Sequence, residues 1–579
     1  MRSMSTLSPF ILLALAGSAS GQAFPAVVEL SSLDGTTGFV INGIDAGDRS
    51  GHSVSSAGDV NGDGIDDLII GARDADPNGH SAAGESYVVF GRTTGFGASI
   101  ELSSLDGTNG FLLNGINAED WSGDSVSGAG DVNGDGIDDL IVGAFGADPN
   151  GQSGAGESYV VFGKSTGFGA SVELSSLDGI VGFSLNGIDA IDQSGLSVSS
   201  LGDINGDGFD DIIIGAPRAY PHGTYIAGQS YVVFGHSTNF AASIELSSLG
   251  GTTGFVLNGI DVYDFSGWSV SSAGDVNGDG IDDLIIGAFN AAPSGESYVV
   301  FGRTTGFGAS IELSSLDGTN GFVINGIDVG DSSGSSVSSA GDVNGDGIDD
   351  LIIGAYRADP NGTYSAGESY VVYGRSAGFG ASFNLASLDG TNGFVLNGIE
   401  DSDLSGSSVS SAGDVNGDGI DDLIIGAWGA DPNDQLYAGE CYVVFGRSIG
   451  FGASLDLSSL DGTTGFVING IDAFDRSGRS VSSAGDVNGD GIDDLIIGAP
   501  LADPNGQTDA GESYVVFGRS DAAPCVPDVN GDGVLTPDDF TAWIAAFNAN
   551  APECDQNGDG NCDPTDFTAW IANFNAGCG

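Results

Sequence analysis

Short apolar runs alternate with clusters of Gly, Asn and Asp along most of the chain. Four kinds of run recur in a fixed order, typified by GFVINGID, SVSSAGD, DDLIIGA and GESYVVFG. Each run is short, rich in Val, Ile, Phe or Tyr and bounded by turn-forming residues, which is typical of β-strands. The pattern therefore predicts an all-β region built from units of four strands.

The four-strand unit repeats at a nearly constant interval. Each unit contains one D-x-N-G-D-G step, and the first Asp of successive steps is 72 residues from the last, with one interval of 67: Asp59, Asp131, Asp203, Asp275, Asp342, Asp414 and Asp486. Seven such units predict a seven-bladed β-propeller, and an open solenoid is the alternative. GFVINGI at 38–44 precedes the first unit, whereas the last unit lacks this strand. We therefore expect residues 38–44 to complete the last blade, which removes an exposed sheet edge.

The units resemble the FG-GAP repeats of the integrin α-subunit propeller, because DVNGDGIDDLIIGA and YVVFG occur in that order in the family. The resemblance covers about residues 28–519. It implies a seven-bladed propeller with calcium in hairpin loops. We assign residues 24–519 to this propeller.

The stretch GDVNGDGIDDLIIGA opens like an EF-hand loop but continues differently. An EF-hand needs an acid at the twelfth position, followed by a helix. Counted from Asp59, that position is Ile70, inside an apolar run that should be a buried strand, and an acid stands instead at the ninth position, Asp67. The sequence therefore predicts a hairpin loop rather than an EF-hand.

Oxygen ligands at alternate positions suit Ca²⁺. In the first loop the predicted ligands are the side chains of Asp59, Asn61, Asp63 and Asp67 and the carbonyl of Ile65, with Asp66 turned to solvent. A turn rich in Asp and Gly without metal is the alternative, although three converging carboxylates repel one another without a cation. The other six loops match, so we expect about seven Ca²⁺ ions, the further ligands being Asp131, Asn133, Asp135, Ile137, Asp139, Asp203, Asn205, Asp207, Phe209, Asp211, Asp275, Asn277, Asp279, Ile281, Asp283, Asp342, Asn344, Asp346, Ile348, Asp350, Asp414, Asn416, Asp418, Ile420, Asp422, Asp486, Asn488, Asp490, Ile492 and Asp494.

The C-terminal residues 520–579 use a similar opening in another way. DVNGDGVLTPDDF places an acid at the twelfth position, a helical pattern follows with Phe540, Trp543, Ile544 and Phe547 on one face, and a second copy comes after it. This α-helical pair of calcium loops resembles a type I dockerin domain, which implies docking onto a cohesin domain. Pro537–Asp538 and Pro564–Thr565 replace the usual Ser/Thr pair, which puts a standard cohesin partner in doubt. About two further Ca²⁺ ions are expected, with ligands Asp528, Asn530, Asp532, Val534, Asp539, Asp555, Asn557, Asp559, Asn561 and Asp566.

The net charge and the N-terminal residues indicate where the protein works in relation to the cell. The formal net charge is −67, from 80 acidic and 13 basic residues, which repels nucleic acid and attracts divalent cations. Residues 1–23 read as a secretory signal, with Arg2 before an apolar stretch and small residues near Gly21. We expect a secreted or cell-surface monomer without a membrane span. Four of the five cysteines, Cys525, Cys554, Cys562 and Cys578, fall in the C-terminal module; they suggest two disulfides, with three pairings open and free thiols as the alternative, whereas Cys441 should be buried and inert.

Differences between the units cluster in two connections, one after GFVINGI and one after LIIGA. Both should emerge on the face opposite the calcium hairpins, where loops commonly carry function. Neutral drift of exposed loops is the alternative. The large or cationic members of the first connection are candidates for a central rosette that binds a glycan or a protein: Trp121, Tyr263, Phe265, Trp268, Phe474, Arg476 and Arg479.

No catalytic pattern stands out. The four histidines, His52, His80, His222 and His236, do not recur between units and read as solvated loop residues, and no G-x-S-x-G element occurs. The zinc domain that accompanies FG-GAP repeats in some phospholipases has no counterpart. We therefore expect a non-enzymatic, calcium-loaded binding or adhesion module, tethered through the dockerin-like module to a cohesin-like or cell-surface partner. A calcium-dependent polysaccharide lyase or hydrolase on the same scaffold is the alternative.

Overall fold

The computed structural model describes residues 24–238, 240–520, 537–549, 567, 570 and 571. Residues 24–518 form one compact unit, and the described residues beyond it belong to another. The predicted signal sequence, the four C-terminal cysteines and the predicted C-terminal calcium loops lie outside the described residues, apart from the backbone of Asp539. No helix in the described part of the chain is long and apolar enough to cross a membrane.

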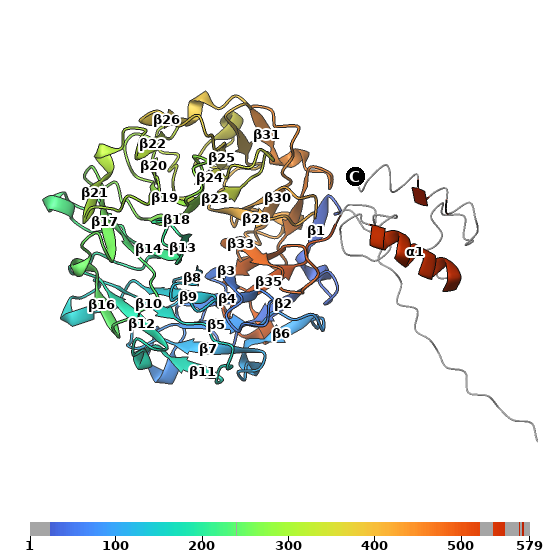
Figure 1. Ribbon diagram of the computed structural model, residues 1–579, viewed down its shortest axis with the longest axis horizontal. Coiled ribbons are helices and arrows are strands. Elements are labelled where there is room, and N and C mark those ends of the chain that lie inside the picture. The colour runs from blue at the N-terminus through green and yellow to red at the C-terminus, as the bar shows by residue number, and fades with distance from the viewer. Residues whose placement is uncertain (1–23, 239, 521–536, 550–566, 568–569, 572–579) are drawn as a thin grey trace, which may run out of the picture. The chain divides into compact units, whose positions relative to one another are not determined.

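Seven five-stranded sheets surround a common centre, as Figure 1 shows, so the prediction of a seven-bladed β-propeller is confirmed. The innermost strands pack against their counterparts in the neighbouring blades. They are β3 (Ser53–Gly58), β8 (Ser125–Gly130), β13 (Ser197–Gly202), β18 (Ser269–Gly274), β23 (Ser336–Gly341), β28 (Ser408–Gly413) and β33 (Ser480–Gly485).

The second and third strands form the buried middle of each blade. All six residues of each second strand are buried, which explains its unbroken apolar run. The second strands are β4 (Asp67–Ala72), β9 (Asp139–Ala144), β14 (Asp211–Ala216), β19 (Asp283–Ala288), β24 (Asp350–Ala355), β29 (Asp422–Ala427) and β34 (Asp494–Ala499). The third strands are β5 (Glu85–Val89), β10 (Glu157–Val161), β15 (Gln229–Val233), β20 (Glu296–Val300), β25 (Glu368–Val372), β30 (Glu440–Val444) and β35 (Glu512–Val516).

The fourth strands close the ring. They are β7 (Gly110–Asn114), β12 (Gly182–Asn186), β17 (Gly254–Asn258), β22 (Gly321–Asn325), β27 (Gly393–Asn397), β32 (Gly465–Asn469) and, for the last blade, β2 (Gly38–Asn42). β2 pairs antiparallel with β35, from Gly38 opposite Val516 to Asn42 opposite Glu512. The N-terminal strand therefore completes the blade that the end of the propeller begins.

Each blade has a fifth strand that the sequence analysis missed. It is three residues long and pairs parallel with the fourth strand, as Ser99–Glu101 does with Val40–Asn42. Three residues are too few to show the alternation of apolar and polar positions that indicates a strand. The fifth strands are β1 (Val27–Glu29), β6 (Ser99–Glu101), β11 (Ser171–Glu173), β16 (Ser243–Glu245), β21 (Ser310–Glu312), β26 (Ser382–Asn384) and β31 (Ser454–Asp456).

Short 3₁₀ turns complete the connections. One kind follows each fifth strand: η1 (Leu30–Ser32), η3 (Leu102–Ser104), η5 (Leu174–Ser176), η7 (Leu246–Ser248), η8 (Leu313–Ser315), η10 (Leu385–Ser387) and η12 (Leu457–Ser459). Another lies between second and third strands: η2 (Pro77–Gly79), η4 (Pro149–Gly151), η6 (Pro221–Gly223), η9 (Pro360–Gly362), η11 (Pro432–Asp434) and η13 (Pro504–Gly506).

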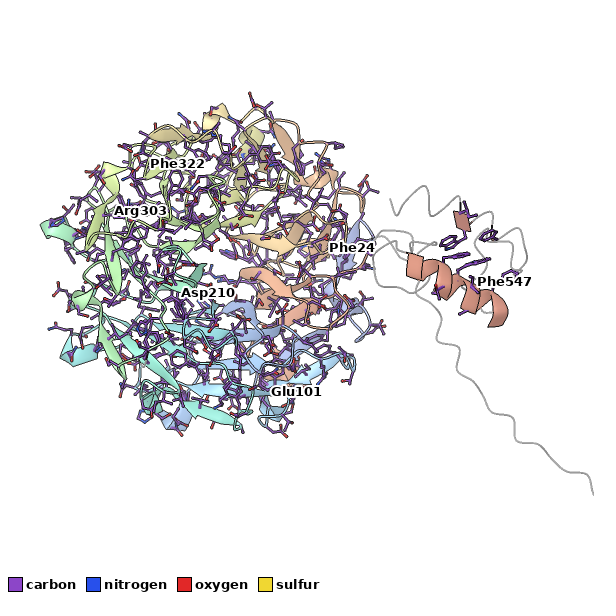
Figure 2. The ribbon with its side chains drawn as sticks, in the orientation of Figure 1. Phe24, Glu101, Asp210, Arg303, Phe322 and Phe547 are labelled. Atoms are coloured by element: carbon purple, nitrogen blue, oxygen red, sulfur yellow. The ribbon has the colours of Figure 1, made fainter. Side chains whose placement is uncertain are left out.

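Phenylalanine pairs fill the outer core between blades. Phe39 of β2 stacks on Phe96 with ring centroids 4.2 Å apart, and Phe24, labelled in Figure 2, stacks on Phe466 at 4.1 Å. Cys441 is buried in β30, where burial and then the charge of Glu440 raise the pKa of its thiol. Cys441 is therefore an inert core residue.

The described C-terminal residues include one helix, α1 (Pro537–Ala549). Its Trp543 is buried and lies 5.5 Å from Phe567 and 6.3 Å from Trp570, measured between ring centroids. Phe540 and Phe547 join this aromatic cluster, whereas Ile544 is exposed, contrary to the predicted apolar face.

Candidate functional site

The hairpin between the first and second strands of each blade is a tightly hydrogen-bonded loop. In the first loop one Asp59 carboxylate oxygen accepts hydrogen bonds from the backbone N–H groups of Gly62 and Asp63, at 2.7 and 3.0 Å. Its other oxygen accepts from the N–H of Gly64 at 2.7 Å. Gly62 and Gly64 have positive φ, at 75° and 87°, which glycine adopts readily. The spacing of the loop residues therefore builds a fixed turn around Asp59.

Asp67 lies at the base of this loop and is fully buried. Its carboxylate accepts hydrogen bonds from the N–H groups of Val60 and Gly91 and from the Asn61 amide. Burial, followed by the charges of Asp63 and Asp59, raises the pKa of Asp67 to about 8. The corresponding carboxyls of the other loops also have raised pKa values, namely Asp139, Asp211, Asp283, Asp350, Asp422 and Asp494.

The oxygen atoms of the loop side chains suit a hard divalent cation, both as ligand atoms and by their negative charge. Carboxylate and amide oxygens are the ligands that Ca²⁺ takes, and a cation would offset the repulsion that raises the pKa of Asp67. Within the described residues, however, no group of three or more His, Cys, Asp or Glu side chains is arranged to hold a metal ion. Asp59 is instead turned toward the N–H groups of its own loop. Asp59, Asn61, Asp63 and Asp67, with the carbonyl of Ile65, are the residues that would hold the ion.

Asp66 is not the solvated residue that the sequence predicts. Its carboxylate accepts a hydrogen bond from the N–H of Asp486 in the neighbouring blade, at 2.9 Å. The same bond joins every neighbouring pair of blades, so the loops form a closed ring; the other acceptors are Asp138, Asp210 (labelled in Figure 2), Asp282, Asp349, Asp421 and Asp493. Nothing inside one unit signals this role, because the partner lies in another unit.

The two variable connections emerge at the end of the blade opposite the hairpin loop. β3 and β4 pair antiparallel, with Gly58 opposite Asp67 at the hairpin end and Ser53 opposite Gly71 at the other. The first connection enters β3 at Ser53, and the second leaves β4 after Ala72. We call this end of the propeller the variable face.

One position of the first connection has the same unusual backbone in every blade. The φ angles of Arg49, Trp121, Gln193, Phe265, Ser332, Leu404 and Arg476 lie between 54° and 60°. This left-handed conformation is uncommon for residues other than glycine and is often found at functional sites. The connection is therefore a constant frame that presents six types of side chain across the seven blades, with arginine in two of them.

The seven predicted rosette residues form several local clusters rather than one centre. Phe265 and Trp268 lie together, with ring centroids 6.4 Å apart, and Arg479 donates its N–H to the Arg476 carbonyl at 3.2 Å. Trp121, Tyr263 and Phe474 each belong to a different cluster, against Phe145, Tyr225 and Tyr437. Tyr263, Trp268 and Phe474 are exposed.

Sequence reasoning missed the aromatic residues of the second connection that pair with these side chains. Phe145, Phe289 and Trp428 directly follow the second strands β9, β19 and β29 and contact Trp121, Trp268 and Arg476 respectively. The signal that could have found them is the variable residue that immediately follows LIIGA or its equivalent in each unit.

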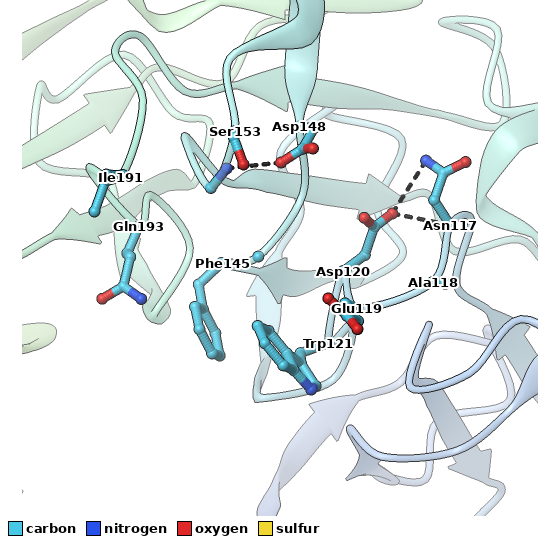
Figure 3. Close-up of a pocket in the computed structure, with 12 residues that line it drawn as sticks. Asn117, Ala118, Glu119, Asp120, Trp121, Phe145, Asp148, Ser153, Ile191 and Gln193 are labelled. Carbon is cyan, nitrogen blue, oxygen red and sulfur yellow. Dashed lines mark hydrogen bonds between the residues drawn. The ribbon is translucent and has the colours of Figure 1, made fainter.

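Trp121 also lines a cavity of about 360 Å³. Figure 3 shows its indole ring beside the Phe145 ring, with centroids 5.1 Å apart, and Asp120 and Asp148 on the other walls. Gln193 reaches the cavity from the next blade. The hollow therefore offers flat apolar rings beside polar acceptors.

Buried Asp48 on the variable face makes stability depend on pH. Burial, and then the charge of Glu85, raises the pKa of Asp48 to about 7, although the N–H of Asp45 acts in the opposite direction. An unfolded Asp has a pKa of about 3.9, so folding stability falls as pH rises from about 4 to 7. We expect Asp48→Asn to raise the free energy of unfolding by about 1 kcal/mol or more at pH 8 and to leave it unchanged at pH 4.

Urea denaturation of both proteins at pH 4 and pH 8 measures this effect. The control is Asp434→Asn, which makes the same charge change at an exposed position in another blade. Equal gains in the two variants, or no gain at pH 8, would contradict the assignment.

Seven segments of the chain match the FG-GAP repeat: residues 50–89, 122–161, 194–233, 266–300, 333–372, 405–444 and 477–516. Each segment spans the first three strands of one blade, with the hairpin loop and the second connection. The chain thus carries seven FG-GAP repeats that fold as an integrin-like β-propeller.

Similar proteins include integrins and phospholipases. Integrin alpha-4 of Xenopus laevis is 33% identical over 162 residues, which are 28% of this chain and 14% of the integrin. Bovine phosphatidylinositol-glycan-specific phospholipase D is 35% identical over 169 residues, 29% of this chain and 19% of the relative. The protein of that name from Dictyostelium discoideum is 27% identical over 429 residues, 68% of this chain and 41% of the relative. The chain therefore matches less than half of the length of each relative.

These relatives contradict the prediction that the chain is not an enzyme. Four mammalian relatives and the Dictyostelium relative are named as a phospholipase D, which is an enzyme. The prediction rested on the absence of short catalytic motifs, and such an absence does not decide whether a propeller takes part in a reaction.

Proposed function

Because seven FG-GAP repeats form an integrin-like propeller here, we propose that the protein is a secreted, calcium-stabilised binding module. Its variable face engages an extracellular protein or glycan, and its C-terminal dockerin-like residues tether or assemble it. The single observation that carries the binding role is the constant left-handed frame of the first connection, which presents six types of side chain on one face of the seven blades. A fixed frame with exchangeable side chains suits recognition.

The aromatic residues of the variable face support a glycan or an extended peptide as ligand. Flat rings such as Trp121 and Trp268 offer large contact area at low conformational-entropy cost, and buried aromatic anchors commonly dominate binding energy. The cavity beside Trp121 adds carboxylate acceptors for hydroxyl or amide donors.

The test is a binding screen of the full chain on glycan and extracellular-protein arrays, repeated with a Trp121→Ser/Trp268→Ser double variant. Serine already stands at the equivalent positions, as Ser332 and Ser335, so the frame should tolerate the change. We expect binding to weaken by about tenfold or more, since truncating a hot-spot aromatic costs about 2 kcal/mol or more. The matched control is Leu404→Ser, at the position equivalent to Trp121, which should bind like the wild type. Undiminished binding by the double variant would contradict the proposed face.

A hydrolytic role on phosphatidylinositol glycans is a second candidate, favoured by the names of the phospholipase relatives. Release of a phosphatidylinositol-glycan-anchored reporter protein from vesicles by the full chain measures it. The polysaccharide-active alternative instead predicts new reducing ends or unsaturated sugars from a polysaccharide. No release in either assay would leave binding without turnover as the activity of the purified chain.

A further inference from the structure

Four of the thirteen basic residues of this acidic chain gather at one place on the variable face. Arg49 and Arg73 belong to the connections around β3 and β4, and Arg476 and Arg479 belong to the connection that enters β33. β3 and β33 pack against each other across the closure of the ring. We call these four residues the arginine cluster.

Arg49 and Arg73, the first pair of arginines in the cluster, each form an ion pair with a carboxylate. Arg73 Nη1 lies 2.6 Å from Asp124 Oδ1, and Arg49 Nη1 lies 3.1 Å from Asp74 Oδ2. Asp124 comes from the next blade and also lies 3.3 Å from His52 Nε2, so His52 is a paired residue and not the solvated one that the sequence predicts. Although burial raises it, hydrogen bonds and charges from His52 and Arg73 hold the pKa of Asp124 below its usual range. Asp124 is therefore an ionised carboxylate that is already paired with Arg73 and His52.

The second pair of arginines has no such partner. Among the described residues, no carboxylate lies within ion-pair distance of Arg476 or Arg479. The Arg476 guanidinium lies over the Trp428 ring, 4.8 Å from its centroid, and its buried Nε has no hydrogen-bond partner in the described part of the chain. The backbone bond between the two residues keeps both side chains on one turn.

Arg479 is partly exposed to solvent and lies near the charges of Arg73, Arg476 and Asp124. More than a third of its surface is exposed. Enclosure by the protein lowers the pKa of its guanidinium, and Arg73 and Arg476 add to this, while Asp124 acts in the opposite direction. An anion beside Arg479 would relieve the repulsion between these cations.

We propose that the arginine cluster binds the phosphate or sulfate ester group of a carbohydrate, with Arg476 and Arg479 as the groups that contact the anion. The guanidinium fork matches a tetrahedral oxyanion with two parallel hydrogen bonds. A carbohydrate is the carrier because an aromatic ring adjoins the cluster, since the Arg476 guanidinium lies over the Trp428 ring. The site rests on the proposed function, since it assigns a ligand class to the same face.

Isothermal titration of the full chain with glucose 6-phosphate, glucose and inorganic phosphate tests the proposal. We expect glucose 6-phosphate to bind about tenfold or more tightly than either fragment, because a charge-assisted pair and a ring contact act together. Equal affinity for inorganic phosphate would overturn the carbohydrate assignment. Absence of glucose 6-phosphate binding would overturn the site, while ligand binding through Trp121 and Trp268 would still stand.

Two variants locate the site and one controls for net charge. Arg479→Ser and Arg476→Ser place at each position the residue that other blades carry there, Ser335 and Ser332, and each should weaken glucose 6-phosphate binding by about tenfold or more. Arg303→His removes an arginine that follows the third strand β20, on the hairpin side of the ring, where His236 stands in another blade. Its binding should match the wild type. Equal losses in all three variants would attribute the effect to net charge and overturn the site, as would unchanged binding in both serine variants.

Discussion

Removal of calcium from the protein is expected to lower its melting temperature by roughly 10 °C or more. A site with a Kd of about 10–100 μM in roughly millimolar calcium adds about 1.4–2.7 kcal/mol. Seven such loops would rival the whole free energy of unfolding of an ordinary domain, about 5–15 kcal/mol, even after a discount for non-additivity. The physical reason lies at Asp67 and its counterparts, which are buried acids surrounded by further carboxylates.

Scanning calorimetry with and without a chelator measures this effect, and native mass spectrometry counts the bound ions. Seven ions from the propeller and two from the C-terminal loops are expected. Asp211→Asn should remove one ion, because it neutralises a buried carboxylate that is a predicted ligand of the third loop. Asp472→Asn makes the same charge change at an exposed position and should remove none. An unchanged melting temperature after chelation would show that the loops are held by their own hydrogen bonds alone.

Deletion of residues 24–44 is expected to abolish the cooperatively folded monomer. The deletion removes β2, whose Phe39 and Ile41 are fully buried and whose five residues pair with β35. Loss of these two core side chains alone costs about 5 kcal/mol or more, and the open edge of β35 then favours association between chains.

Light scattering after size exclusion, together with a thermal melt, tests the role of the closing strand. Deletion of residues 24–34 is the matched control, because it leaves β2 in place and removes β1, η1 and Phe24, which pack on another blade. This shorter deletion should leave a monomer with a lower but cooperative transition. A folded monomer after the longer deletion would show that five complete blades and two incomplete blades suffice.

The repeats made the ring predictable from the sequence, because each strand except the outermost carries its own pattern. Second strands are buried on both faces and read as DLIIGA, and innermost strands read as SVSSAG, with Val54 and Ala57 as the buried positions of the first. The fifth strand escaped because three residues cannot establish a period. The closure by β2 was predictable because each kind of strand occurs seven times but out of phase.

The missed parts of the sites depend on contacts between units. Asp66 bonds to Asp486, 420 residues away, and only the closed ring brings them together. The arginine cluster likewise joins residues from the first and last units across the same closure. A comparison of units locates variable positions, but it does not reveal which variable positions become neighbours.

The closing strand β2 has the same sequence, GFVIN, as β22 and β32. Its partner β35 reads ESYVV, as do β5, β10, β20 and β25. The pairing that closes the ring therefore has no sequence specificity of its own. Any copy of GFVIN matches any copy of ESYVV in backbone and side chains.

Tethering favours a partner strand of the same chain over a strand of another molecule. In one folding molecule the effective concentration of β2 near β35 is set by the chain that joins them, and in dilute solution it exceeds the concentration of strands from other molecules. In a concentrated refolding mixture that advantage shrinks, and β2 of one molecule can seal the last blade of another. The identity of the repeated strands therefore predicts that closure within one chain competes with exchange of β2 between chains as the protein concentration rises.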